Sequence, residues 1–524
     1  MRSLIPAPAA ISPALVALFF LASFPVVAQQ RPSGSQQQSA ASGSSQGDIA
    51  AVLRDMQSQI QQLSSQLGEM KADSVQLRNE LQSTRSELAA LKNSSAPAPS
   101  PFPVATAPAT SESSSTEERL SRIEENQQLA DAKIAEQSQT KVESSSKYRV
   151  RLSGIVLLNT YINRGSVDNE DFPQIAVPRD FLGSDGSFGG SLRQSQIALQ
   201  AFGPTLAGAR TSADVRFDFA GGFPTAPNGA SFGIMRLRTG TVRLDWQNTS
   251  LIAGQDSLFF VPLSPTSLAT LATPALSYSG NLWAWAPQIR VEHTIHLGES
   301  SSFILQGGIL DSMSGDIPSG DYGRSPTWGE QSGLPAIAGR AAVAHSFFDQ
   351  PFTVGVGGYF GRQDWGFSRK VDAWAATIDL AVPLGSRFEF DSAVFRGRGL
   401  GGLGGGIGQT SLWSGSFVDP TTEIYGLNSI GGWAQLKFKA TSKLQLNGAF
   451  GEDNPFASDM RTLGGSQQYF ASPLSKNLSF FGNFIYQPRS DIVLSLEYRR
   501  LKTFKLDSNA DSANHINFSL GYIF

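Results

Sequence analysis

A series of segments in which polar and apolar side chains alternate constrains the fold of this chain most. The clearest is 209–219, where one set of side chains comprises Ala209, Thr211, Ala213, Val215, Phe217 and Phe219, and the other Arg210, Ser212, Asp214, Arg216 and Asp218. Alternation with a period of two places the two sets on opposite faces of a β-strand. A stretch of about ten residues is also the length that a tilted barrel strand needs to cross a bilayer.

Sixteen such segments follow residue 147. They lie near 149–162, 191–202, 208–220, 232–247, 250–255, 285–297, 301–311, 336–347, 352–361, 370–382, 387–397, 428–440, 442–451, 477–487, 491–505 and 512–524. Short connections alternate with long ones, as in outer-membrane β-barrels, whereas a soluble sandwich has no reason to keep this order. The sequence therefore predicts an all-β transmembrane barrel of about 16 antiparallel strands, with 18 left open.

The last ten residues, His515–Phe524, alternate in the same way and end on an aromatic side chain. Taken alone, this strand suits a soluble sheet as well as the closing strand of a barrel. The alternating connections favour the barrel, with Ile516, Phe518, Leu520 and Tyr522 facing lipid and His515, Asn517 and Ser519 facing the lumen.

The N-terminus has the pattern of a secretory signal peptide over residues 1–28. Arg2 precedes the apolar run 15–21, and the small residues before Gln29 suit cleavage. After residue 28 the sequence contains no run of about 18 apolar residues, which is the length that a membrane-spanning helix needs. An exported chain of this kind enters a membrane only as a closed barrel.

A heptad repeat of apolar residues over 48–92 predicts an α-helical coiled coil before the barrel. Apolar residues occupy most a and d positions from Ile49 to Leu91, which favours an identical neighbour over a lone amphipathic helix. A disordered linker (29–47) precedes the coiled coil, and a Pro/Ala/Ser linker (93–116) and a short second coiled segment (117–146) follow it. The barrel occupies 147–524.

The composition argues against several classes of function. The chain has no cysteine and a net charge of −3, which gives no disulfide framework and no general attraction to nucleic acid. The four histidines lack metal-ligand spacing, and the common catalytic motifs are absent. We therefore expect no enzyme activity, no cofactor and no metal.

Six arginines on the second to fourth predicted strands are candidates for a basic stripe lining the pore: Arg193, Arg210, Arg216, Arg236, Arg238 and Arg243. Arginine rings are one means by which pores favour anions. Arg243 joins the stripe only if a bulge near Gly240 shifts the register. The alternative is that the arginines pair with Asp214, Asp218 and Asp245 and only hold the wall together.

The long connection 256–284 is too apolar for a free loop. Asp256, Phe259 and Phe260 begin it, and several leucines follow. We expect it to fold into the lumen as a constriction loop. The alternatives are a subunit contact or a position over the barrel mouth.

The layout resembles DcaP-like trimeric outer-membrane porins with an N-terminal periplasmic coiled coil. The features that match are the signal peptide, the heptads of Ile49–Leu91, the linker, the sixteen predicted strands and terminal Phe524. The resemblance implies three associated barrels, helices that trimerise, and passage of small, often anionic solutes. In outer-membrane proteins generally, a final strand like this one, with Tyr522 and Phe524, resembles the signal read by the barrel assembly machinery.

The sequence thus predicts a porin of the outer membrane for passive diffusion of small hydrophilic solutes, with anion preference as a hypothesis. Its expected partners are further copies of the chain, outer-membrane lipids, the assembly machinery and small solutes, with no nucleic acid. The alternative is a structural envelope tether whose barrel anchors a coiled coil in the periplasm. Solute identity, the oligomeric state and a contact to peptidoglycan are left open.

Overall fold

The computed structural model describes residues 149–223, 233–316, 323–347, 350–463, 466–467, 473–506 and 509–524. The chain divides into two compact units, Met1–Glu112 and Ser113–Phe524, and all the described residues belong to the second. The predicted signal peptide, linkers and coiled segments fall on residues 1–146, outside the described residues, and stay predictions.

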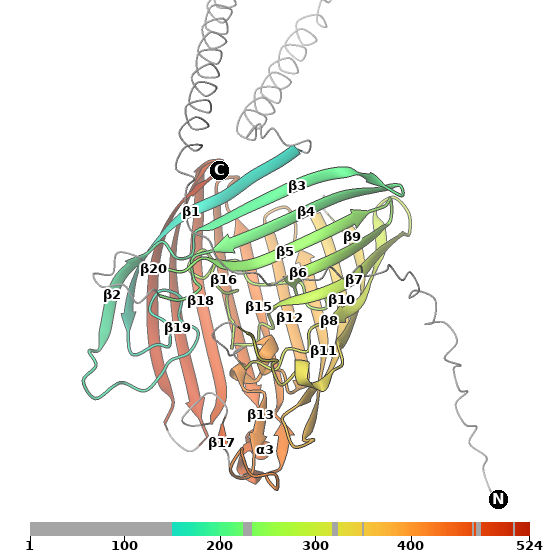
Figure 1. Cartoon of the computed structure of the whole chain (residues 1–524). Helices are drawn as coiled ribbons and strands as arrows, with labels where there is room; N and C mark the ends of the chain where they lie inside the picture. Colours follow the sequence, from blue (N-terminus) through green and yellow to red (C-terminus); the bar gives the residue numbers. More distant parts are fainter. Residues whose placement is uncertain are drawn as a thin grey trace, which may run out of the picture. The chain divides into compact units, whose positions relative to one another are not determined.

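The described part is an antiparallel sheet rolled into a closed barrel (Figure 1). Its strands are β1 (Arg149–Arg164), β2 (Gly186–Ser191), β3 (Gln196–Leu206), β4 (Ala209–Asp218), β5 (Arg236–Asp245), β6 (Thr249–Ser257), β7 (Trp285–His296), β8 (Ser301–Leu310), β9 (Ala336–Phe347), β10 (Gln350–Asp364), β11 (Lys370–Pro383), β12 (Phe388–Arg398), β15 (Asn428–Lys439), β16 (Leu444–Pro455), β18 (Leu474–Arg489), β19 (Ile492–Lys505) and β20 (Asp511–Ile523). The short β2 shares one strand position with β3, because both pair with β1. Sixteen strand positions therefore surround the barrel, and the predicted fold class is confirmed for the described residues.

Smaller elements lie in the loops. They are β13 (Ser411–Trp413), β14 (Ile424–Gly426), β17 (Ser466–Gln467), α3 (Ala457–Thr462) and the 3-10 turns η2 (Glu330–Ser332), η3 (Gly401–Leu403) and η4 (Gly406–Gly408). No helix among the described residues is both long and apolar enough to cross a membrane.

The barrel closes where β1 meets β20. Their register runs from Ile155 opposite Ile523 to Arg164 opposite Asn514. Gly154 and Phe524 complete the seam, because the Gly154 amide donates to the Phe524 carbonyl at 2.8 Å and the reverse bond is 3.1 Å long. The last residues of the sequence thus form the closing strand, as predicted.

The second strand position is interrupted between β2 and β3, where the sequence predicts one strand over 191–202. Residues 192–195 leave the ladder, and the Leu157 amide donates instead to Ser195 Oγ at 2.9 Å. The prediction of an unbroken strand there is wrong, because a serine hydroxyl replaces the backbone partner. The break turns Arg193 and Gln194 into buried positions.

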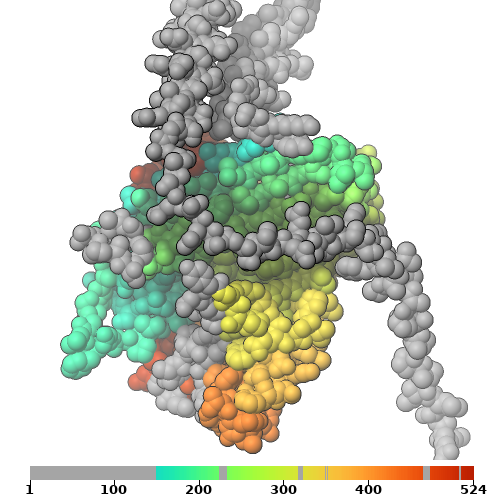
Figure 2. Space-filling view, in the orientation of Figure 1, coloured from blue at the N-terminus to red at the C-terminus, as the bar shows by residue number. Residues whose placement is uncertain are grey.

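The two faces of the wall differ as the alternation predicts. On β20 the side chains of Ile516, Phe518, Leu520 and Tyr522 are 41–50% exposed, whereas His515, Asn517 and Ser519 are at most 1% exposed. The apolar side chains face outward and the polar ones face the interior. Short turns gather at one end of the barrel, and the long loops extend from the other (Figure 1, Figure 2).

Candidate functional site

The long loop between β6 and β7 lies inside the barrel. Phe259 and Phe260 are 3% and 0% exposed. They belong to one apolar cluster with inward-facing residues of β10, β11, β12, β15, β16 and β18, namely Tyr359, Ala375, Phe395, Trp433, Ala449 and Phe481. Outward neighbours such as Val394 are exposed, so the cluster is on the lumen side. The loop therefore occupies interior space that the barrel wall alone would leave to water.

Side chains of the wall hold this loop by hydrogen bonds along its length. The bonded pairs are Phe260 O with Thr377 of β11 (2.8 Å), Thr266 N with Gln435 of β15 (2.9 Å), Ser267 Oγ with Glu497 of β19 (2.5 Å), Leu268 O with Asn159 of β1 (3.1 Å) and Ala269 O with Gln194 (2.8 Å). These anchors come from widely separated strands. A loop with no regular structure of its own thus has its backbone groups satisfied by the lumen wall.

The loop approaches the wall closely at Gly280. Its φ is +93°, and a Cβ there would lie 2.2 Å from the Gly432 carbonyl oxygen and 2.5 Å from that of Glu452. Any other residue would collide with the backbone of β15 and β16 and adopt a strained conformation. Glycine is therefore required for the loop to seat.

Arg236 and Arg238 of β5 converge on one carboxylate. Arg236 Nη2 lies 2.7 Å and Arg238 Nη1 3.5 Å from Asp218 Oδ2, and Asp218 is fully buried. The same guanidinium groups donate to the loop carbonyls of Ala272 and Leu271, at 2.7 Å in both bonds. They also lie 5.0 and 4.7 Å from the ring centroid of Trp285. Two arginines sharing one carboxylate leave a net positive charge at this wall.

A β-bulge brings Arg243 to the same face as Arg236 and Arg238. The register between β4 and β5 shifts between Arg216 and Phe217, which leaves Arg238 without a register partner. The shift puts Arg243 opposite Ser212 of β4. Ser212 and Arg216 lie on the same face of the sheet, so Arg243 shares that face. The sequence required a bulge near Gly240 for this arrangement, and the structure places it two residues earlier.

The other four candidate arginines are near carboxylates. Arg193 is 3.0 Å from Asp171 in a buried pair, Arg243 is 2.6 Å from Asp245, and Arg216 is 3.9 Å from Asp214. Arg210 lies opposite Asp245 in the register of β4 and β5. Asp214, Asp218 and Asp245, which the sequence offered as partners if the arginines only hold the wall together, are thus all near candidate arginines, as is Asp171. A pore-lining role for the six stays a prediction.

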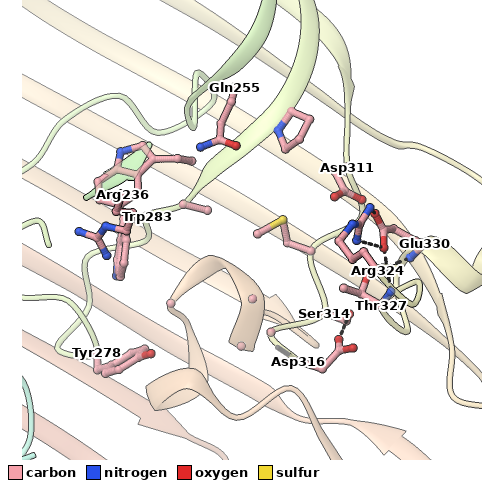
Figure 3. A pocket seen from close by; sticks show the side chains of 18 residues that line it. Arg236, Gln255, Tyr278, Trp283, Asp311, Ser314, Asp316, Arg324, Thr327 and Glu330 are labelled. Carbon is pink, nitrogen blue, oxygen red and sulfur yellow. Dashed lines mark hydrogen bonds and ion pairs between the residues drawn. The ribbon is translucent and has the colours of Figure 1, made fainter. Parts of the chain in front are cut away.

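A cavity of about 630 Å³ lies beside the inner loop. Arg236, Gln255, Trp283 and Trp285 line it from the β5–β7 side, and Tyr278 from the inner loop itself. Across it is the loop between β8 and β9, whose lining residues include Asp311, Met313, Asp316, Arg324 and Glu330 (Figure 3). Gly401, Gly402 and Gly404, after β12, complete the lining. The volume is that of a small-molecule site.

The acidic wall of this cavity was not predicted. Arg324 holds Glu330 by two hydrogen bonds of 2.6 and 2.7 Å, and this hydrogen bonding lowers the pKa of Glu330 to about 2. Asp316 accepts hydrogen bonds from Ser314 and from the Trp328 amide. Burial, with a further contribution from the charge of Glu330, raises the pKa of the Asp311 carboxyl. The only sequence signal for these acids was their position in a long loop.

The residues offer no evident place for a metal ion. Within the described ranges, no group of three or more His, Asp or Glu side chains has the arrangement of a metal site. Three histidines instead make hydrogen bonds: His293 with Thr249 (2.8 Å), His345 with Ser301 (2.8 Å) and His515 with Asn163 (2.6 Å). Absence of a cofactor stays a prediction.

Comparison with solved structures finds outer-membrane channels. The outer membrane channel DcaP of Acinetobacter baumannii matches with a TM-score of 0.56 at 17% identity, over 74% of this chain and 100% of that chain. An anion-selective porin from Comamonas acidovorans matches with a TM-score of 0.44 at 13% identity, over 72% of this chain and 100% of that one. No protein-family model and no curated protein matches the sequence. The resemblance to DcaP-like channels is thus confirmed for the fold.

Proposed function

We propose that this protein is a porin that lets small hydrophilic solutes diffuse passively across the outer membrane. The observation that carries the proposal is a closed barrel of sixteen strand positions whose interior holds a wall-anchored loop beside a cavity of about 630 Å³. Barrels of this size enclose a lumen too wide for wall side chains alone to fill. A loop folded into such a lumen narrows the pore and leaves the barrel wall unchanged.

The outward side chains support the membrane location. Exposed apolar residues occur on most strands of the barrel, including Val156, Ile289, Val356, Val394 and Leu496. In water such a surface would be an extensive apolar patch, whereas a bilayer satisfies it. The signal sequence adds that the chain is exported, so the outer membrane is the proposed location.

Charge preference follows from the residues that face the lumen. Arg236 and Arg238 share a single carboxylate, so they retain a net positive charge, whereas the pairing of Arg193, Arg216 and Arg243 offsets theirs. We place any preference for anionic groups at the first two arginines. The inner loop with Phe259 and Phe260 is the proposed constriction. Asp256, which the sequence analysis assigned to this loop, lies instead on β6, because it pairs with Ala286 of β7, and it contacts Arg290 at 2.8 Å.

Assembly is proposed from the sequence. The heptads of residues 48–92 would join copies of the chain into a trimer, with the coiled coil in the periplasm. Tyr522 and Phe524 would serve as the signal for the barrel assembly machinery. Phe524 is half-exposed at the seam between β1 and β20, where such a machinery could contact its side chain.

Conductance in a planar bilayer tests the porin proposal. The full-length protein should give stepwise currents in KCl, and a salt gradient should give a reversal potential that reports charge preference. Replacing Arg236 and Arg238 by glutamine should move that potential toward cation preference. A correctly folded, inserted barrel that passes no ions would refute the proposal.

The tether alternative is favoured by the apolar cluster in the lumen, because a filled barrel is a sufficient anchor. Deletion of residues 29–145 separates the two functions. If cells with the deletion keep solute uptake but lose envelope integrity, the coiled coil acts as a tether. If the deletion instead impairs solute uptake, the channel is the main role of the protein.

A further inference from the structure

The cavity beside the inner loop has a positive side. Arg236 presents a side chain that is 28% exposed, while its partner Asp218 is fully buried. Since Arg238 shares the same carboxylate, one positive charge is uncompensated there. Arg236 Nε and Nη2 already donate to Asp218 and to the Ala272 carbonyl, so a solute anion would bind to Nη1 of the guanidinium group and not to the acid behind it. A charge-assisted hydrogen bond from this nitrogen suits a carboxylate.

The opposite side of the cavity is negative. Asp311, Asp316 and Glu330 all line it, with Arg324 as their cationic neighbour. Arg324 is committed to Glu330 by two hydrogen bonds. The remaining two acids give this wall a net negative charge. Figure 3 shows Arg236 and the three acids on opposite sides of the cavity.

Aromatic and apolar groups line the same cavity as the two charged sides. They are Tyr278, Trp283 and Met313, and the rings of Trp283 and Trp285 meet edge to face with centroids 5.3 Å apart. Because both charged sides line one cavity, both act on a solute that occupies it.

We propose that this cavity is a binding site for small zwitterions whose two charges lie at opposite ends of an apolar or aromatic body. The anionic group of the solute binds at Arg236, the cationic group binds at the wall of Asp311 and Asp316, and the body packs on Trp283 and Tyr278. A simple anion contacts Arg236 but is repelled by the acids. A simple cation contacts the acids but is repelled by Arg236. The inference rests on the proposed channel function and narrows its solute class.

Three solutes with the same aromatic ring test the proposal. 4-(Aminomethyl)phenylacetate carries its two charges at opposite ends of the ring, 4-methylphenylacetate lacks the ammonium group, and 4-methylbenzylamine lacks the carboxylate. Each is added to the full-length protein in a planar bilayer at 0.15 M salt, roughly physiological ionic strength, and the apparent Kd is read from current block. One charge contact at a half-buried site is worth about fivefold in affinity. The zwitterion should therefore bind about fivefold more tightly than either analogue.

Two substitutions assign the two ends of the solute. Arg236→Gln should weaken binding of 4-(aminomethyl)phenylacetate and 4-methylphenylacetate by about fivefold and leave 4-methylbenzylamine bound no more weakly. Asp311→Asn should weaken binding of 4-(aminomethyl)phenylacetate and 4-methylbenzylamine and leave 4-methylphenylacetate bound no more weakly. Arg461→Gln on α3 and Glu299→Gln in the turn after β7 are matched charge controls, and neither residue lines the cavity.

The outcomes separate this inference from the channel proposal. Ion currents without preference for 4-(aminomethyl)phenylacetate over both analogues would overturn the zwitterion site but not the porin proposal. A barrel that conducts no ions would overturn both. The comparison of the three solutes uses the unmodified protein. It can therefore refute the proposal even if a substitution impairs folding.

Discussion

Replacing Phe260 by alanine should unseat the inner loop without opening the barrel. Phe260 is fully buried and stacks on Tyr359 of β10 with ring centroids 5.5 Å apart, and it also meets Phe259 edge to face. Truncation of a buried phenylalanine costs about 3–5 kcal/mol. Because only the loop, and not the strand ladder, relies on this contact, that cost falls on loop seating. The population of unseated loop should rise ~100-fold or more.

Single-channel recording measures this effect. The Phe260→Ala channel should show larger conductance steps and more current noise than the unmodified channel. Phe360→Ala is the matched control, because Phe360 is 44% exposed on the outer face of β10 and should leave conductance unchanged. Loop cleavage by an added protease gives a second readout. Conductance, noise and protease resistance all equal to those of the unmodified protein would refute the idea that this ring holds the loop.

Three further outcomes are expected. Asp379→Asn should lower barrel stability by about 3–5 kcal/mol, measured as the temperature at which unboiled protein loses its folded electrophoretic mobility, because it leaves the buried guanidinium of Arg340 unpaired. Gly280→Ala should increase conductance noise with little change in that temperature, since the collision at β15 and β16 affects only the loop. Block by 4-methylbenzylamine should weaken on acidification at a higher pH than an ordinary aspartate predicts, because the pKa of Asp311 is raised, whereas Glu330, whose pKa is lowered to about 2, keeps its charge and its hydrogen bonds with Arg324 at pH 4.

The strand framework was largely predictable, because it depends on patterns that are local in sequence. Each of the sixteen predicted segments overlaps a strand of the barrel. The inward and outward sets on β20 also follow from alternation alone, since a strand has only two faces. The exception is the break at 192–195, where a serine hydroxyl replaces a backbone partner and no periodicity announces it.

The candidate site was only partly predictable, because charges act on whichever neighbours the fold supplies. The sequence identified Arg236 and Arg238 as inward-facing, but that both share Asp218 depends on a bulge whose position only the register reveals. The acids Asp311 and Asp316 come from a separate loop, and nothing in their spacing predicts the cavity that they line.

Local patterns alone predict the barrel, its closing strand and the apolar loop between β6 and β7, because alternation and hydrophobicity are properties of single segments. The position of that loop and its contacts depend on the tertiary structure. The residues that anchor the loop lie on segments far apart in sequence, and barrel closure brings them around one lumen. They are Thr377, Gln435, Glu497, Asn159 and Gln194. Contacts of that kind depend on the register of every intervening strand, and so they emerge only when the sheet has closed.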